Sequence, residues 1–162
     1  MIDLEKAITS LAANNVDYVI VGGVAITLHS SGYITRDLDL CYSREKSNLR
    51  RLVAALSPYD PKPRNWPDGL PFTFDERTLG SGTNFTFETT IGDVDLLGDV
   101  KGVGDYSDAI SRSVTFELYG VRVDAFDLDA LIASKTAAGR PKDQLVLPEL
   151  LALREALDPN EE

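Results

Sequence analysis

Apolar residues recur along this chain with two different periods, and together they predict a fold that mixes helices and strands. Spacings of three and four residues, typical of amphipathic helices, mark residues 3 to 14 and 44 to 56. Runs of β-branched and aromatic residues, or strict alternation, predict strands. The expected helices cover residues 3–14, 24–30, 44–56, 128–138 and 142–157, and the expected strands cover 16–21, 37–42, 84–88, 94–97, 114–118 and 121–126. This order favours the α/β (α+β) class, with a mixed, twisted sheet, flanking helices and two C-terminal helices.

Proline and glycine interrupt the pattern. Residues 58 to 71 hold five of the eight prolines, which predicts a loop without regular structure rather than a domain boundary. That loop is either a lid over the substrate or a partner contact. Residues 98 to 104 are expected to form a glycine-rich loop, and residues 91 to 93 a turn. We expect a single domain over residues 1–157, followed by an acidic tail at 158–162.

Composition narrows the classes of function. The 162 residues include 26 Asp and Glu against 16 Lys and Arg, a net charge of −10, which argues against a protein whose nucleic-acid affinity rests on neutralising many phosphates. The single cysteine, Cys41, cannot form a disulfide within the chain and is expected in the core. No apolar run approaches the roughly 20 residues of a membrane span, and the N-terminus lacks a basic leader, so we expect a cytoplasmic protein without a membrane partner.

Asp37 and Asp39 are the strongest chemical signal in the sequence. Alternation along the predicted strand places both carboxylates on one face, with their Cα atoms about 6 to 7 Å apart. Two like charges so placed favour a cation, and Mg²⁺ prefers carboxylate and phosphate oxygens. Taken alone, an Asp-x-Asp is more often a solvated strand end than a metal site. The interpretation therefore depends on the surrounding motifs.

Two further features supply that context. Gly22 and Gly23 follow a predicted buried strand and open a helix, where free backbone N–H groups favour an anion such as a triphosphate, although a tight turn alone would also explain them. Asp95 lies on a later strand and adds a third carboxylate. Asp93 is the alternative, but Val94 and Leu96 flank Asp95, whereas Asp93 adjoins the expected turn.

In this order the motifs resemble the nucleotidyltransferase superfamily of the polymerase-beta type. More narrowly, residues 19–25, 35–40 and 135–143 resemble the small bacterial AbiEii-like nucleotidyltransferases, which are related to abortive-infection toxins. Two departures are the glycine at position 23, where the Gly-Ser variants offer a serine hydroxyl to the phosphate, and a length below that of the better-known toxins. The Lys135-to-Asp143 segment strengthens the narrower resemblance.

The resemblance implies transfer of a nucleoside monophosphate from an NTP to an acceptor hydroxyl, with pyrophosphate released. It implies that Asp37, Asp39 and Asp95 bind metal, two Mg²⁺ ions or alternatively Mn²⁺, and catalyse the reaction. Lys135 would neutralise phosphate charge, and Asp143 would orient Lys135 or the nucleotide. The residues expected to bind substrate or nucleotide are Gly22, Gly23, Thr35, Arg36, Lys135 and Asp143.

Three interpretations of the function, each with its own partners, remain open. The resemblance favours a tRNA or protein acceptor in a toxin–antitoxin setting, with a cognate antitoxin as a possible partner, and a small alcohol such as an aminoglycoside is the other acceptor. A catalytically inactive fold that binds nucleotide or a partner protein is an alternative, and an acidic mimic of nucleic acid is another. Basic rims are expected on both sides of the acidic site, from Arg44, Lys46, Arg50 and Arg51 and from Arg140 and Lys142.

Two aromatic residues are expected to be structural. His29 is the only histidine, and it more plausibly makes a hydrogen bond from its helix than serves as a base. Trp66 lies among the prolines and is expected to cap the core rather than stack on a nucleobase.

Overall fold

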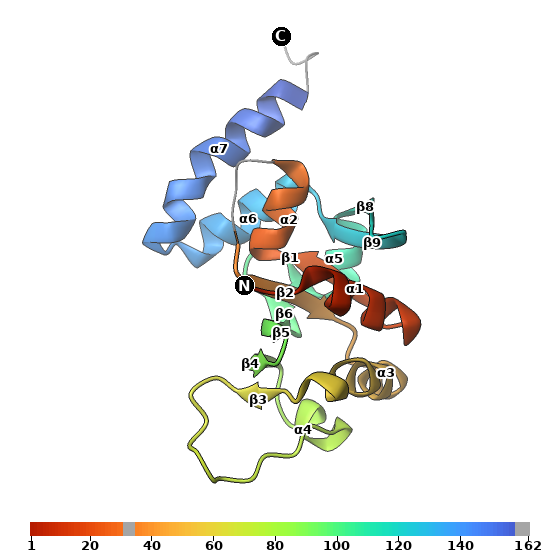
Figure 1. The fold of residues 1–162 in the computed structure, drawn as a ribbon. Coiled ribbons are helices and arrows are strands. Elements are labelled where there is room, and N and C mark those ends of the chain that lie inside the picture. The colour runs from red at the N-terminus through yellow and green to blue at the C-terminus, as the bar shows by residue number, and fades with distance from the viewer. Residues whose placement is uncertain (31–34, 158–162) are drawn as a thin grey trace.

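The computed structural model describes residues 1–30 and 35–157, which form helices around one mixed sheet (Figure 1). The predicted turn residues Ser31 and Gly32 and the predicted tail 158–162 lie outside the described residues. The helices are α1 (Leu4–Ala13), α2 (Gly22–His29), α3 (Lys46–Leu56), the 3-10 turn η1 (Ser57–Tyr59), α4 (Glu76–Gly80), α5 (Tyr106–Ser111), α6 (Leu128–Ala138) and α7 (Pro141–Leu157). The strands are β1 (Tyr18–Val21), β2 (Asp37–Tyr42), β3 (Lys62–Pro63), β4 (Asn84–Thr89), β5 (Gly92–Leu97), β6 (Asp99–Val100), β7 (Gly104–Asp105), β8 (Ser113–Leu118) and β9 (Val121–Phe126).

Seven strands form the main sheet in the order β3-β4-β5-β2-β1-β9-β8. The pairs β2–β5 and β1–β9 are parallel and the other neighbours are antiparallel, so the predicted mixed α+β architecture is confirmed. Strands β2 and β5 lie side by side although 49 residues, 43–91, separate them in the sequence. This non-local pairing brings the two acidic motifs together.

Local sequence signals explain most helix ends. The side chain of Asp3 accepts a hydrogen bond from the backbone N–H of Lys6 and caps α1, as predicted. Asp127 caps α6 in the same way, and Gly139, with φ of 63°, ends that helix in the left-handed conformation that glycine favours. The two C-terminal helices therefore begin and end close to their predicted positions.

The core lies where α1 and α3 meet the sheet and around β1, whose four residues are all buried. Cys41 is fully buried, as expected. His29 makes the predicted hydrogen bond, between its Nε2 and the backbone oxygen of Phe126 at 2.8 Å. Trp66 packs edge-on against Phe72 and is half-buried, which agrees with a capping role.

Four local predictions need correction. Helix α2 begins at Gly22 rather than at residue 24, and β5 begins at Gly92, so the turn lies one to two residues earlier than expected. Residues 98–104 are not a simple loop, because β6 and β7 pair as a short hairpin. The proline-rich segment includes η1 and the edge strand β3, which pairs with β4 through Lys62 and Pro63. Proline is tolerated there because an edge strand leaves one row of N–H groups unpaired.

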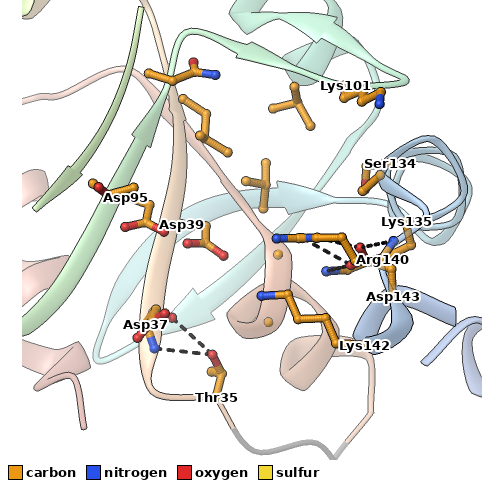
Figure 2. A pocket seen from close by; sticks show the side chains of 18 of the residues that line it. Thr35, Asp37, Asp39, Asp95, Lys101, Ser134, Lys135, Arg140, Lys142 and Asp143 are labelled. Atoms are coloured by element: carbon orange, nitrogen blue, oxygen red, sulfur yellow. Dashed lines mark hydrogen bonds and ion pairs between the residues drawn. The ribbon is translucent and has the colours of Figure 1, made fainter. Parts of the chain in front are cut away.

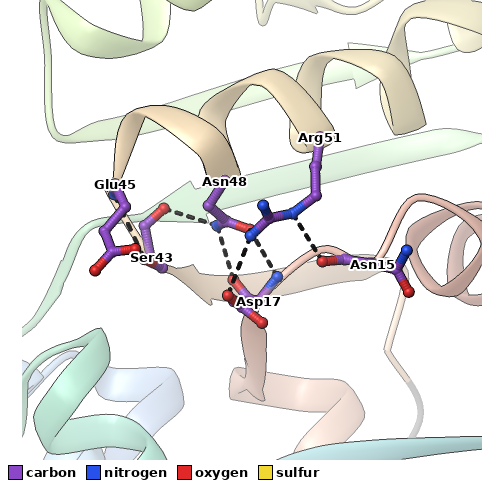
Figure 3. Close-up of polar contacts among 6 residues, drawn as sticks. All are labelled: Asn15, Asp17, Ser43, Glu45, Asn48 and Arg51. Atoms are coloured by element: carbon purple, nitrogen blue, oxygen red, sulfur yellow. Dashed lines mark hydrogen bonds and ion pairs between the residues drawn. The ribbon is translucent and has the colours of Figure 1, made fainter.

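A buried asparagine joins the start of β1 to the end of β2 (Figure 3). Asn48 on α3 is fully buried, and its Nδ2 donates to the backbone oxygens of Asp17 and Ser43 at 3.0 and 2.8 Å. Its Oδ1 accepts from the Asp17 N–H at 2.7 Å and from Arg51 at 3.3 Å. Every hydrogen-bonding group of this amide is therefore paired. The network fixes α3 against the ends of the two central strands β1 and β2.

Replacing Asn48 by Ala is expected to lower the free energy of unfolding by about 3 kcal/mol, because it removes this buried network and leaves the part-buried Asp17 N–H without its acceptor. Urea unfolding followed by tryptophan fluorescence measures the change. Lys46→Ala, an exposed substitution on the same helix, is the control and should cost less than about 0.5 kcal/mol. Equal stability of the two variants would contradict a structural role for Asn48.

Within the described ranges, no helix combines the length and the apolar character that a membrane-spanning segment needs.

Candidate active site

The turn between β1 and α2 brings backbone N–H groups next to the acidic strand. Val21, the last residue of β1, pairs with Asp39 of β2. Gly22 has φ of 68°, and a Cβ at this position would overlap with the carboxylate of Asp39. Glycine is thus required both by the backbone conformation and by the close approach. No side chain of residues 1–30 or 35–157 caps the N-terminus of α2, which leaves its first N–H groups available to an anion.

The parallel register of β2 and β5 decides which acids are neighbours. Asp37 lies opposite Asp93, and Asp39 lies opposite Asp95. Asp39 and Asp95 both line the same cleft, whereas Asp93 does not line it. Figure 2 shows the carboxyl groups of Asp39 and Asp95 side by side, with Asp37 at the start of β2. The geometry therefore places Asp95, the preferred third acid, in the cleft.

Asp39 and Asp95 interact strongly with each other. The pKa of Asp39 is raised to about 7, mainly by burial and in addition by the negative charge of Asp95 and a hydrogen bond between the two carboxyl groups. Burial also raises the pKa of Asp95, although the nearby guanidinium of Arg64 opposes this shift. Two neighbouring carboxyl groups that each raise the cost of ionising the other mark a place where an added cation is stabilised.

These acids suit a divalent cation in their chemistry, since carboxylate oxygens are the ligands that Mg²⁺ and Mn²⁺ prefer. Only Asp39 and Asp95 are in contact, however. Among residues 1–30 and 35–157, no group of three or more Asp, Glu, His or Cys side chains is gathered closely enough to hold an ion. Asp37 lies on the same face of β2 as Asp39. A site of three carboxylates would therefore require the Asp37 side chain to rotate toward the other two.

A cluster of cations faces the acids from α6 and α7. Asp143 has no exposed side-chain surface, and its carboxylate lies 3.2 Å from Lys135 Nζ and 2.7 Å from Arg140 Nε. Burial by itself raises the pKa of Asp143, but the hydrogen bonds from Arg140 and Lys135 outweigh it and lower the pKa to about 2. This ionised aspartate orients both cations, and the side chains of Lys135 and Arg140 share the cleft with Asp39 (Figure 2).

The acids, the glycine turn and the cations line one cleft of about 550 Å³. Thr35 stands at its edge, where its hydroxyl donates to the backbone oxygen of Asp37 at 3.2 Å. Arg36 is exposed there and makes no ion pair with any residue of the described ranges. The structure thus brings together every residue expected from the sequence to form the site: Gly22, Gly23, Thr35, Arg36, Asp37, Asp39, Asp95, Lys135 and Asp143.

Comparison with known proteins shows which solved structures share this fold. No protein-family model and no curated protein sequence matches the chain. Solved structures do match. A candidate nucleotidyltransferase from Thermotoga maritima is 16% identical with a TM-score of 0.58, and the match covers 94% of this chain and 96% of that one. ANT(2")-Ia in complex with adenylyl-2"-tobramycin is 17% identical with a TM-score of 0.55, covering 98% and 97%. The chain has a nucleotidyltransferase fold.

A third match, an antigenic nucleotidyltransferase-like protein from Paracoccidioides brasiliensis, has a TM-score of 0.53 at 17% identity and covers 94% of this chain and 77% of that one. These likenesses extend over nearly the whole nucleotidyltransferase fold of this protein. They do not distinguish the AbiEii-like group from other proteins that share the fold. The narrower resemblance remains a prediction from the sequence.

Two basic residues near the acids were not expected from the sequence: Lys101 lines the cleft, and Arg64 contacts one of its acids without lining it. Lys101, at the tip of the β6–β7 hairpin, borders the cleft because Gly102 packs so closely on Ala133 and Ala137 of α6 that a Cβ would clash. Arg64, from the proline-rich segment, lies 2.6 Å from Asp95. No sequence signal identifies either residue, since both depend on contacts between distant segments.

The predicted basic rims are half correct. Arg140 and Lys142 line the cleft, but the basic residues of 44–51 do not. Arg44 donates to Tyr42 and to the end of α4, Arg50 pairs with Glu76, and Arg51 binds Asp17. These side chains therefore have structural partners away from the acids.

In metal-free solution, the free energy of unfolding of this nucleotidyltransferase-fold protein is expected to fall as the pH rises from about 4 to about 7. The folded-state pKa of Asp39 is raised to about 7, above its unfolded value of about 3.9. The folded protein therefore binds more protons than the unfolded chain in this range, and its stability decreases as they dissociate. Chemical unfolding in EDTA at several pH values measures the trend.

Asp39→Asn is the matched variant for this trend, because it keeps the shape of the side chain and cannot ionise. Its gain in stability over the wild type should be larger at pH 8 than at pH 4. Parallel profiles for the two proteins would show that Asp39 has an ordinary pKa.

Proposed function

We propose that this protein transfers a nucleoside monophosphate from an NTP to the hydroxyl group of an acceptor and releases pyrophosphate. One observation carries the proposal: within a single cleft, the Asp39–Asp95 pair faces the Lys135–Asp143–Arg140 cluster, and the uncapped N-terminus of α2 lies beside Asp39. A polyphosphate needs cations and N–H donors, and an in-line displacement needs carboxylates to hold metal ions near the α-phosphorus. The nucleotidyltransferase fold supports this assignment.

In the proposed reaction, the acceptor oxygen forms a bond to the α-phosphorus while the bond from the α-phosphorus to the bridging oxygen of the β-phosphate breaks. Pyrophosphate leaves with that electron pair, and the hydroxyl proton passes toward the carboxylate of Asp95. Held by Asp37, Asp39 and Asp95, one or two Mg²⁺ or Mn²⁺ ions would activate the acceptor oxygen and stabilise the leaving group.

The chain's own groups position the nucleotide. N–H groups at the start of α2, with Gly22 and Gly23 allowing close approach, bind phosphate oxygens. Lys135, held by Asp143, neutralises charge that develops on the leaving pyrophosphate. Arg36, which has no ion-pair partner in the part of the chain that the structure describes, contributes a further cation at the opening of the cleft. Most of the rate enhancement then comes from positioning and charge neutralisation.

The acceptor expected from the resemblance is a tRNA or a protein, in a toxin–antitoxin setting with a cognate antitoxin. A specific observation favours the alternative, a small cationic alcohol. Only one of the two expected basic rims borders the cleft, while the opposite wall is acidic and the whole chain carries a net charge of −10. Such a surface attracts a cation and repels an RNA backbone. ANT(2")-Ia, with its adenylyl-2"-tobramycin, is a neighbour in fold.

Calorimetric titration of the four NTPs, with and without Mg²⁺, tests the donor site. We expect Mg²⁺-dependent binding of at least one NTP to the wild type and its loss in the double variant Asp37→Asn, Asp39→Asn. The control is Asp60→Asn, Asp68→Asn, which removes two carboxylates outside the cleft and should bind as the wild type does. An NTP that binds without turnover would favour the inactive fold, and no binding to any NTP would overturn the proposal.

Labelled NTP then distinguishes the acceptors. Incubation with tobramycin, with bulk tRNA and with protein extract should give a labelled product in one of the three mixtures. Label in the small-molecule fraction supports the cationic alcohol, whereas label in tRNA or protein supports the toxin-like acceptor.

A further inference from the structure

Arg64 connects the proline-rich segment to the third carboxylate. It follows β3, and its backbone N–H donates to the oxygen of Thr86 on β4 at 3.0 Å. Its side chain reaches across β4 to β5, where Nη2 lies 2.6 Å from Asp95 Oδ1 and Nε lies 3.5 Å from Asp93 Oδ2. About 31% of the Arg64 side chain is exposed, against 19% for Asp95. The guanidinium is thus partly shielded between two acids.

The two contacts of this guanidinium differ in quality. The bond to Asp95 is short and charge-assisted, whereas Nε is buried and has no hydrogen-bond acceptor within the described residues, because Asp93 is only near enough for an ion pair. A small shift of Arg64 toward Asp93 would give Nε an acceptor and would release Asp95 Oδ1. In this position Arg64 donates a hydrogen bond to Asp95, but its own Nε has no acceptor among the described residues.

Asp95 Oδ1 is also an oxygen that a divalent cation beside Asp39 would use. A guanidinium and a divalent cation cannot both take the same carboxylate oxygen at short range without repelling each other. We propose, on the basis of the function proposed above, that Arg64 is a positioning residue: it holds Asp95 in the absence of metal and moves onto Asp93 when a divalent cation binds at Asp39 and Asp95. Metal binding is thereby coupled to the proline-rich segment.

The segment contains its own reporter. Trp66, the only tryptophan, lies two residues after Arg64, and its N–H donates to the oxygen of Pro63 at 3.0 Å. Its indole donates to the backbone oxygen of Leu70 at 2.9 Å and packs against Phe72. A displacement of Arg64 changes the turn that holds this indole. In Figure 1 the segment is the wide yellow-to-green loop beyond β3, at the far end of the sheet from α7.

The test compares wild type, Arg64→Gln and Lys62→Gln. Lys62→Gln is the matched control, because it removes one positive charge from the same segment, and Lys62 pairs with the exposed Asp60, outside the cleft. Calorimetric titration with Mn²⁺ alone should show about fivefold tighter binding to Arg64→Gln, since the competing cation is gone. Lys62→Gln should bind Mn²⁺ within about twofold of the wild type.

Trp66 emission during titration with Mg²⁺ supplies the second readout, which a merely structural role would not move. The wild type and Lys62→Gln should show a saturable change, and Arg64→Gln should lose most of it. Arg64→Lys, which keeps the charge but cannot bridge two carboxylates, should restore weaker metal binding without restoring the full emission change. Thermal unfolding of each variant checks that the fold is intact.

The outcomes separate this proposal from the proposed function. If Mn²⁺ binds to the wild type and is lost in Asp39→Asn, but Arg64→Gln binds it no more tightly or keeps the Trp66 signal, the role of Arg64 is refuted and the function stands. If Mn²⁺ does not bind to the wild type at all, the role of Arg64 is refuted, and the NTP titration with Mg²⁺ decides the proposed function separately. Tighter binding together with loss of the Trp66 signal supports the coupling.

Discussion

Asp39→Asn lowers the rate of pyrophosphate release by at least about 10³-fold with the acceptor that supports turnover in the wild type. Asp39 is the acid that touches both the glycine turn and Asp95, so no other side chain of the described residues can replace it. An amide keeps the shape but removes the negative charge that would hold a metal ion. Coupled pyrophosphate detection over a range of NTP concentrations measures the loss, which should appear in kcat more than in KM.

Two neighbouring variants sharpen this prediction. Asp95→Asn should cost the same order of magnitude, because Asp95 shares the cleft with Asp39. Asp93→Asn removes the same charge two residues away on the same strand and should cost less than about tenfold, because Asp93 does not line the cleft. If a folded Asp39→Asn protein keeps a tenth of wild-type turnover, or if Asp93 matters more than Asp95, the assignment of the acids is wrong.

Asp143→Asn lowers the free energy of unfolding by about 3 kcal/mol at neutral pH, because it leaves Lys135 and Arg140 without the charge that pairs them. The Asp143 side chain has no exposed surface and only 14% of Lys135 is exposed, so water compensates poorly for the loss. Urea unfolding measures the difference. NTP affinity should fall as well, since Lys135 is no longer held toward the cleft.

The pH dependence gives this prediction a second check. The folded-state pKa of Asp143 is lowered to about 2, below its unfolded value of about 3.9, so its stabilisation is complete above pH 4 and is lost as the pH falls toward 2. The gap between variant and wild type should narrow over that interval. Asp129→Asn, which breaks the exposed pair with Arg154 on the same two helices, is the control and should cost about 0.5 kcal/mol. Similar losses for Asp129 and Asp143 would contradict a special role for the buried acid.

The predicted elements were accurate where a local signal marked them. Residues 128–138 and 121–126 form α6 and β9 with the predicted bounds, because capping residues and a Tyr-Gly turn define their ends. The errors lie where a distant partner decides the conformation. Strand β3 forms among prolines only because β4 offers it an edge, and β6 and β7 pair only because the hairpin packs on α6.

The residues of the candidate site also divide into those that a local sequence signal marks and those that only contacts between distant segments bring to the site. Asp37, Asp39, the glycine turn and the Lys135-to-Asp143 segment are recognisable from short spacings. The preference for Asp95 over Asp93 came from its apolar neighbours, but its place beside Asp39 follows from the register of a parallel pair. Arg64 lies 31 positions from Asp95 in the sequence and was missed, because only the strand order β3-β4-β5 brings the two together.

The sequence by itself determined the fold class, most of the longer helices and strands, and the residues proposed to carry the chemistry, because periodicity, capping and alternation act over a few positions of the chain. Only the tertiary structure decided which acids share an oxygen-lined cleft, which basic residues face it, and that Arg64 occupies one oxygen of Asp95. Those relations depend on the pairing of strands and on side-chain burial, which arise from contacts between segments far apart in the sequence and leave no local pattern.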